Sequence, residues 1–434
     1  MSVGVGIIGL GTVGLKTAAI LGGGENGSFG HKLREPVKLV HAADRGVSRG
    51  EKFPGLPAGC RLSADGRAVV DDGDVQIVVE LIGGVTSAKD LVLAALRKGK
   101  TVVSANKALI AHHAEEILDA CRSGGADFLF EASVAGGIPV IRALREGLAG
   151  DRVNGIKGII NGTCNYILTE MEKRGVEYEP VLKDAQRLGY AEADPSFDID
   201  GIDAAHKLCV LMMAAFGARF MPGTIRATGI SSVSLKDIRY AGDFGFAIRL
   251  LGTAARGADG RIAARVEPVL VSRRSLLAHV DGPMNAVLVE SENLGTTIYF
   301  GAGAGGGATA TAVVGDILEA VRGLGCRGRV PVFGHNRLEA GVPADLAAMA
   351  SPFFLRFEVR DEPGVLAALA QALGQNGVSI ARMVQSDGET GDHPVEVVMM
   401  THPVAEKGLL KALEAVQSRP FLLSVPHRLR VEQS

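Results

Sequence analysis

The sequence predicts an α/β fold in three parts: a parallel sheet covered by helices, a central α+β domain, and a C-terminal βαββαβ unit. Two observations support this division. Short apolar strands alternate with helical segments over residues 1–130, and longer strands of alternating character follow over residues 131–302. The pattern changes again over residues 351–434. A chain of 434 residues with 47% apolar content is long enough to build two or three domains.

The N-terminal part begins with an apolar strand (residues 3–8), a glycine turn and a helical segment. Further strands are predicted in VKLVHAAD, DVQIVVELIGG and KTVVSANKAL, with a helix in SAKDLVLAALRKGK between the last two. Apolar strands that alternate with helices are typical of a parallel sheet covered on both faces. A second glycine turn and helix at about residues 303–325 is expected to return and complete this part.

The central part contains the strands RIAARVEPVLV and NAVLVESENLGTTIYF and an apolar helix, IDAAHKLCVLMMAAF. Residues 326–350 are rich in Pro, Gly and Arg and are predicted to form a linker. Residues 351–434 then run strand, helix, strand, strand, helix, strand, which is the order of a ferredoxin-like split unit.

Composition excludes several classes of partner. With 46 basic and 48 acidic side chains the net charge is -2, so no strong field favours nucleic acid or anionic membrane. The run LCVLMMAAFGA is much shorter than the roughly 20 residues that span a bilayer. The five cysteines are widely spaced, without a C-x-x-C pair. A cytoplasmic protein with a small-molecule partner is expected.

The turn Gly9-Leu10-Gly11-Thr12-Val13-Gly14 lies between the first strand and the first helix. In such a turn the glycines permit a tight bend, close approach of a pyrophosphate and close helix–strand packing, and the helix N-terminus faces the phosphates. This predicts a dinucleotide-binding Rossmann domain. Asp44, at the end of the second strand, could bind the ribose of NAD, while Arg45 could bind the 2′-phosphate of NADP, so both cofactors remain open.

The stretch LGYAEADPSFDIDGIDAAHKL places five carboxylates (Glu192, Asp194, Asp198, Asp200 and Asp203) ahead of one base, Lys207. A loop followed by a helix N-terminus accounts for Asp198 and Asp200. Asp203 and Lys207 lie four residues apart in a helix predicted to be mostly buried. They form either an ordinary pair at a helix start or part of a reactive site.

A series of motifs resembles those of the homoserine dehydrogenase family: GLGTVG, DVQIVVELIGG, SANKALIA, FEASVAGGIPVI, INGTCNYILTEM, LGYAEADPSFDIDGIDAAHKL and GAGAGGGATATAVVGD. The resemblance covers about residues 3–325. Asp361-Glu362-Pro363-Gly364, between a strand and a helix, resembles the start of an ACT domain. With no aspartate kinase region ahead of residue 1, the chain resembles the monofunctional form.

The resemblance implies reversible, NAD(P)H-dependent reduction of L-aspartate 4-semialdehyde to L-homoserine, a step of threonine, methionine and isoleucine biosynthesis. It implies that the central part is a catalytic and dimerisation domain. Lys207 matches the family's acid, Glu192 and Asp203 match its substrate-binding carboxylates, and Lys107 matches a lysine close to cofactor and substrate. Gly189 and Gly303 match cofactor contacts, although each could serve backbone geometry alone.

The resemblance also implies a sodium site formed by the acid at Glu131 and the carbonyls of Val134, Gly136 and Ile138. It implies a homodimer or homotetramer whose ACT domain binds an amino-acid effector, with L-threonine as the first candidate. Two positions depart from the family pattern: Cys164 replaces a threonine and Ala308 replaces a proline. Neither position carries a charged catalytic group, so the two departures affect packing and cofactor contact rather than the reaction.

Two other functions are compatible with these residues. One is a dehydrogenase acting on a different amino acid, and the other is a sensor that binds nucleotide and amino acid without turnover. The set of Lys107, Glu192, Asp203 and Lys207 argues against the sensor, because partly buried charges are costly where no chemistry needs them.

Overall fold

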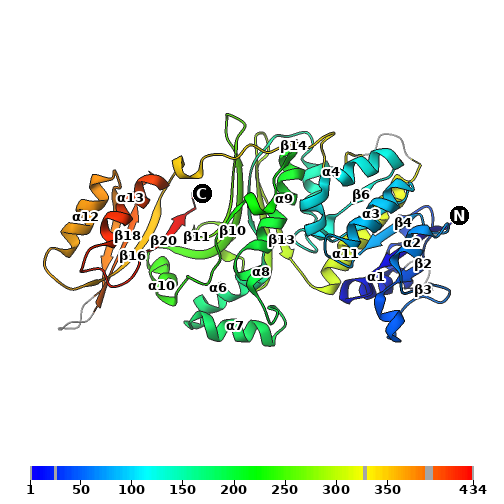
Figure 1. Ribbon diagram of the computed structural model, residues 1–434, viewed down its shortest axis with the longest axis horizontal. Helices are drawn as coiled ribbons and strands as arrows, with labels where there is room; N and C mark the ends of the chain where they lie inside the picture. Colours follow the sequence, from blue (N-terminus) through cyan, green and yellow to red (C-terminus); the bar gives the residue numbers. More distant parts are fainter. Residues whose placement is uncertain (1, 24–26, 326–329, 387–393, 433–434) are drawn as a thin grey trace.

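The computed structural model describes residues 2–23, 27–325, 330–386 and 394–432, and its three parts lie in a row (Figure 1). The N-terminal part is at one end and the C-terminal unit at the other. The last strand returns toward the centre of the molecule. The predicted α/β class, with a parallel sheet, a mixed central sheet and a βαββαβ unit, is confirmed.

The N-terminal part contains a six-stranded parallel sheet within the described residues. The strands follow the order β3 (Arg61–Ser63), β2 (Val37–Ala43), β1 (Val3–Ile8), β4 (Ile77–Glu80), β5 (Thr101–Ser104) and β6 (Phe128–Leu129). Alternate side chains of β4 enter different cores: Val78 joins the core under α3 (Ser87–Arg97) and α4 (Lys107–Gly124). Ile77 and Val79 join the core under α1 (Thr12–Gly22) and α11 (Gly306–Gly323). Both faces are therefore covered.

The central and C-terminal sheets are continuous. The order is β13 (Gly295–Ala302), β12 (Met284–Ser291), β7 (Val153–Ile159), β10 (Phe246–Arg256), β11 (Ile262–Ser272), β20 (His427–Val431), β16 (Phe353–Arg360), β18 (Pro394–Thr401) and β17 (Ile380–Gln385). The helices α6 (Gly162–Arg174) and α9 (Ile202–Phe216) pack on the central strands. Strand β20 runs parallel to β11, with Val269 opposite Arg430. The C-terminal unit is thus joined to the central part by backbone hydrogen bonds.

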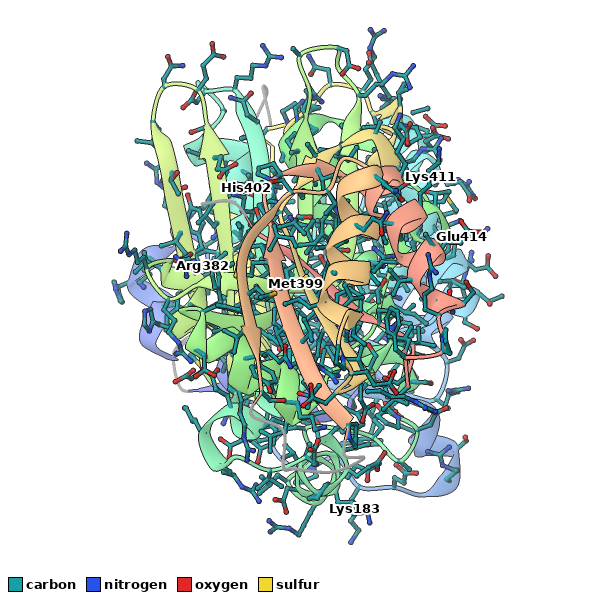
Figure 2. All side chains as sticks on the ribbon, turned by 90° about the vertical axis from the view of Figure 1, so that its left-hand side faces the viewer. Lys183, Arg382, Met399, His402, Lys411 and Glu414 are labelled. Carbon is teal, nitrogen blue, oxygen red and sulfur yellow. The ribbon has the colours of Figure 1, made fainter. Side chains whose placement is uncertain are left out.

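The C-terminal unit places α12 (Val365–Gln375) and α13 (Glu406–Gln417) over one face of its strands. Figure 2 views this end of the molecule, with β17 and its Arg382 at the edge beside Met399 of β18. Lys411 and Glu414 project from α13 (Figure 2).

The segment predicted as a linker lies against the central part. Its β14 (Glu339–Ala340) pairs with β8 (Ala218–Arg219), and Ile262 forms an isolated bridge with Pro343. Residues 326–329, including Cys326, lie outside the described ranges. Within those ranges, no helix combines the length and apolar character needed to cross a membrane.

Candidate active site

The glycine turn has the geometry that its sequence predicts. Gly9 has a φ of +101°, which favours glycine. A Cβ at Gly14 would lie 2.0 Å from the carbonyl oxygen of Gly9, so helix α1 approaches the strand end too closely for any side chain. A Cβ at Gly11 would meet no atom within 4 Å, which leaves open space beside the N-terminus of α1. That space fits an approaching pyrophosphate.

Asp44 fixes the neighbouring strand end to this turn. One carboxylate oxygen accepts a hydrogen bond from the Leu10 amide and the other from the Gly46 amide, each at 2.8 Å. Arg45 follows and is exposed. Asp44 and Arg45 line a cavity of about 510 Å³ that extends to Gly83 and Gly84 after β4. The cavity therefore lies where the adenosine end of a dinucleotide would be expected.

A buried polar array at the ends of β4 and β5 positions Lys107. Glu80, fully buried, accepts hydrogen bonds from the Ser104 hydroxyl at 2.6 Å and from the Ile82 amide at 3.0 Å. Burial raises the pKa of Glu80. Asn106 caps α4 by accepting from the Leu109 amide. Lys107 is then the first residue of α4 and emerges at the carboxyl ends of the strands.

Lys207 and Asp203 lie in the first two turns of α9, which follows Gly201 in a left-handed conformation (φ +81°). Lys207 Nζ donates to an Asp203 carboxylate oxygen at 2.7 Å and to the Ile160 carbonyl at 2.8 Å. Lys107 Nζ reaches the other Asp203 oxygen at 3.0 Å. Asp203 therefore bridges two lysines that come from different parts of the molecule.

The electrostatics of this cluster favour a charged Asp203. Its side chain is only 4% exposed. Burial alone would raise the pKa of Asp203, but the charges of Lys207 and Lys107 outweigh burial and hold the pKa below its usual range. The Lys107 and Lys207 side chains remain 32% and 14% exposed, so a small molecule can still reach them.

Asn161 is a member of this cluster that the sequence reasoning did not single out. Its side-chain amide donates to Asp203 at 2.9 Å and to Asp198 at 2.7 Å, while its oxygen caps α6 at the Cys164 amide. Asp198, expected to serve only a helix dipole, is thus linked through Asn161 to the cluster of Asp203 and the two lysines. An asparagine directly before a helical pattern was the available signal, but it indicated only a cap.

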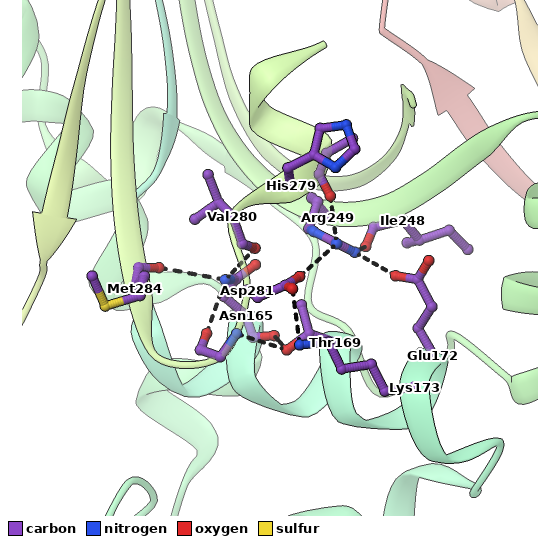
Figure 3. A network of polar contacts seen from close by, with 12 residues as sticks. Asn165, Thr169, Glu172, Lys173, Ile248, Arg249, His279, Val280, Asp281 and Met284 are labelled. Atoms are coloured by element: carbon purple, nitrogen blue, oxygen red, sulfur yellow. Dashed lines mark hydrogen bonds and ion pairs between the residues drawn. The ribbon is translucent and has the colours of Figure 1, made fainter. Parts of the chain in front are cut away.

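The body of α6 is anchored by a second polar network (Figure 3). Asn165 donates from its side chain to the carbonyl of Val280 at 2.9 Å. Arg249, 2% exposed, donates to Glu172 at 2.9 Å and to the Ala278 carbonyl at 2.7 Å. These bonds fix α6 against the loop between β11 and β12, and so hold Asn161 in place.

Comparison with known proteins agrees with this geometry. The family profile described as "Homoserine dehydrogenase, NAD binding domain" matches residues 9–131, and the profile "Homoserine dehydrogenase" matches residues 139–318. The chain belongs to the homoserine dehydrogenase family. An ACT domain profile matches residues 353–421, so the resemblance seen at Asp361-Glu362-Pro363-Gly364 is confirmed.

Individual members of the homoserine dehydrogenase family match over nearly their whole length. A homoserine dehydrogenase from Pseudomonas aeruginosa is 41% identical over 99% of this chain and 98% of its own. The crystal structure of one from Thiobacillus denitrificans has a TM-score of 0.92 and 40% identity, with 100% of this chain and 98% of that chain covered. A hyperthermophilic archaeal homoserine dehydrogenase in complex with NADPH covers 74% of this chain and 98% of its own, with a TM-score of 0.62 and 29% identity.

The remaining residues matched to homoserine dehydrogenases lie in different surroundings. Gly189 (φ +78°) and Glu192 lie in an exposed loop between α7 (Tyr178–Arg187) and α8 (Ser196–Ile199). Gly303 packs tightly: a Cβ there would overlap the Asn285 side chain, and its carbonyl lies against Gly136. Packing against the buried Asn285 side chain is therefore by itself a reason for glycine at position 303.

Glu131 begins an irregular segment between β6 and α5 (Val140–Arg142). Its buried carboxylate accepts from the amides of Ile141 and Arg142, each at 2.8 Å. Ala135 and Gly136 both have left-handed φ angles, +54° and +52°. The Ile138 carbonyl accepts from the Val140 amide at 2.8 Å.

The two departures from the family pattern are both packed. Cys164 is fully buried, and its thiol donates to the Asp198 carbonyl at 3.2 Å. Burial raises the pKa of the Cys164 thiol. Ala308 lies against Gly137, where a Cβ would come within 3.0 Å of it. Cys164 is therefore a small buried residue rather than a reactive thiol.

Proposed function

We propose that this protein catalyses the reversible NAD(P)-dependent interconversion of L-homoserine and L-aspartate 4-semialdehyde. The observation that carries this proposal is the cluster in which Asp203 bridges Lys107 and Lys207, with Lys107 at the same edge of the parallel sheet as the glycine turn. A reaction that moves a hydride at carbon and a proton at oxygen needs such a proton carrier beside the nicotinamide. Family membership supports the substrate assignment.

In the reducing direction, Lys207 acts as the general acid. Its ammonium has three donors, of which two are used by Asp203 and the Ile160 carbonyl. The third has no acceptor among the residues that the structure describes, so it can donate a proton to the aldehyde oxygen, and in the oxidising direction the neutral amine accepts the hydroxyl proton. When bound, the nicotinamide supplies the hydride to the carbon that carries this oxygen, or accepts the hydride from it in the oxidising direction.

Asp203 and Asn161 position the two lysines. Asp203 keeps Lys207 and Lys107 within 3.0 Å of one carboxylate, and Asn161 donates to the same oxygen of that carboxylate as Lys207 does. Asp203 and the exposed Glu192 are also proposed to receive the substrate ammonium. Lys107 Nζ also lies 5.9 Å from the centroid of the Phe197 ring. In this position Lys107 would contact both substrate and cofactor.

The test is the initial rate of NAD and NADP reduction with L-homoserine, measured for the intact protein and for Lys207→Ala. We expect turnover that falls by about 10² or more in the variant. Lys183→Ala, which changes an exposed lysine on α7, is the matched control and should retain full activity. Absence of turnover with both cofactors in the intact protein would refute the proposal and favour a sensor.

We infer that both NAD and NADP are accepted. Asp44 is held by two backbone amides and presents its carboxylate to a ribose, whereas Arg45 is exposed at the rim of the same cavity and can meet a 2′-phosphate. Arg45→Ala should raise KM for NADP and leave KM for NAD nearly unchanged. Equal changes for the two cofactors would argue against this role.

We also propose a monovalent cation at Glu131 with the carbonyls of Val134, Gly136 and Ile138. Burial raises the pKa of Glu131, although donors at Arg142 and Ile141 oppose the rise, so a cation would favour its charged form. An irregular backbone rich in carbonyls suits a hard ion. Sodium chloride should raise the unfolding temperature more than choline chloride does at equal ionic strength. The substitution Glu131→Gln should abolish this difference between the two salts.

The C-terminal ACT domain is proposed to bind an amino-acid effector and to pair with a second copy. Strand β17 is an exposed edge, on which Met383 and Val384 are each 41% exposed. Edge strands of this kind readily accept a partner strand. Light scattering should therefore give a dimer or tetramer. If millimolar L-threonine changes neither rate nor thermal stability, the choice of threonine is wrong.

A further inference from the structure

A small cavity lies between the C-terminal unit and the central part. Its volume is about 220 Å³, and it is bordered by β20 on one side and by β9 (Arg226–Ala227) and β11 on the other. The polar side chains that line it include Arg226, Thr228, Ser232, His427, Arg428 and Arg430. The position is the point at which the two sheets join, and is separate from the exposed edge at β17.

Arginines outnumber carboxylates at this cavity, although its lining also includes the acidic Glu267. The Glu267 carboxylate lies 2.6 Å from Arg430 and 3.4 Å from Arg226. A third guanidinium, Arg265, lies 3.5 Å from the same carboxylate. Burial, together with the charges of Arg430 and Arg226, lowers the pKa of Arg265. Glu267 therefore contacts three arginines.

Two further carboxylates, Glu406 and Glu432, bring the total to three for the four arginines at this place. Arg226 and Arg428 share Glu406, at 2.9 and 2.8 Å. Arg430 is 8% exposed and uses Nε and Nη1 on Glu267 and Glu432, but its Nη2 has no hydrogen-bond partner among the described residues. Leaving a donor of a buried charged group unpaired costs free energy, so an acceptor at this place would be stabilising.

We propose that this cavity binds a small oxyanion, either a phosphate or the carboxylate of a small metabolite, through Arg428 and Arg430. Planar guanidinium groups bind both anions with paired, charge-assisted hydrogen bonds. The hydroxyls of Thr228 and Ser232, both in exposed residues at the cavity, supply further donors. The volume is below the usual range of nucleotide-sized pockets, which restricts the ligand to a compact anion.

The cavity is connected to the catalytic cluster by a short stretch of chain. Thr228 follows β9 and donates its amide to the Val266 carbonyl at 2.8 Å. Two residues later, the Ile230 amide donates to the Ile199 carbonyl at 2.9 Å. Ile199 is the last residue of α8, and the short turn that follows leads into α9, where Asp203 lies. An anion that orders this stretch would therefore change how Asp203 is held, an effect that rests on the proposed function.

The test is isothermal titration calorimetry of the full-length protein with inorganic phosphate and, separately, with succinate, at constant ionic strength. Saturating NADP is present throughout, so that phosphate cannot bind at the glycine turn. We expect at least one probe to bind, and Arg428→Gln to weaken its binding by roughly tenfold, because the variant loses a charge-assisted hydrogen bond to the anion. Arg360→Gln is the matched control, because Arg360 is 58% exposed and pairs only with the exposed Glu362 among the described residues.

Comparison of phosphate binding with succinate binding identifies the oxyanion as a phosphate or a carboxylate.

The Thr228→Val, Ser232→Ala double variant alters only exposed hydroxyls, and should weaken binding without lowering the unfolding temperature. Failure of both probes to bind, or equal binding by the intact protein and Arg428→Gln, would overturn the proposal. Calorimetry does not depend on turnover: binding without activity would refute only the dehydrogenase assignment, and activity without binding would refute only this site.

Discussion

The two halves of the candidate active site are built in opposite ways. The glycine turn is continuous in sequence, and the contacts that shape it, at Gly9, Leu10 and Gly14, are made within the turn or with the ends of neighbouring strands. The proposed catalytic cluster is assembled from three distant segments, which contribute Lys107, Asn161 and the pair Asp203 and Lys207. The shape of the first half is set by backbone geometry, whereas the side chains of the second half are held in place by ion pairs.

This difference determines what each half tolerates. A backbone turn fails when a side chain is added, because there is no room for it. A charge cluster fails when a charge is removed, because its neighbours are then left buried without a partner. The predictions below use this contrast.

The largest effect is expected from Asp203→Asn. The substitution keeps the shape of the side chain but leaves Lys107 and Lys207 without their shared counter-charge. We expect kcat/KM for L-homoserine to fall by about 10², as for loss of a general acid. Asp194→Asn, in the exposed loop of the same stretch, is the control and should be nearly neutral. Similar losses in both variants would mean that Asp203 has no special role.

A smaller effect is expected from alanine in the glycine turn, and it should differ between two positions. Gly14→Ala places a Cβ against the Gly9 carbonyl and should destabilise the fold by about 1–3 kcal/mol, as overpacking does. Gly11→Ala meets no protein atom, so thermal unfolding should be unchanged while KM for both nucleotides rises, roughly tenfold. A Gly11→Ala protein with normal KM would show that no pyrophosphate lies there.

The smallest effect is on stability in acid. Because the folded pKa of Asp203 is depressed, its contribution is complete above its unfolded pKa of about 3.9 and is lost as pH falls further. The difference in free energy of unfolding between the intact protein and Asp203→Asn should shrink as pH falls from 5 to 3. Urea titrations across this range measure it, and a constant difference would contradict the depressed pKa.

The same contrast explains what the sequence could predict. The parallel sheet, the glycine turn and the βαββαβ unit were predicted because each is marked by local patterns. Asn161 could be recognised only as a cap, because its second role depends on Asp198 and Asp203 far along the chain. The joining of β20 to β11 was not predicted, since pairing between distant strands leaves no local signal. The roles of Gly189 and Glu192 stay predictions.

The central claim is that Lys107, Asp203 and Lys207 act as one unit, and a double-mutant cycle tests it most directly. The measurement is kcat/KM for L-homoserine in Lys107→Ala, Lys207→Ala and the double variant. Residues that act as a unit show strongly non-additive losses, so the double variant should lose little more than Lys207→Ala alone. If the two losses multiply, the lysines act independently, and the account of a shared cluster is wrong.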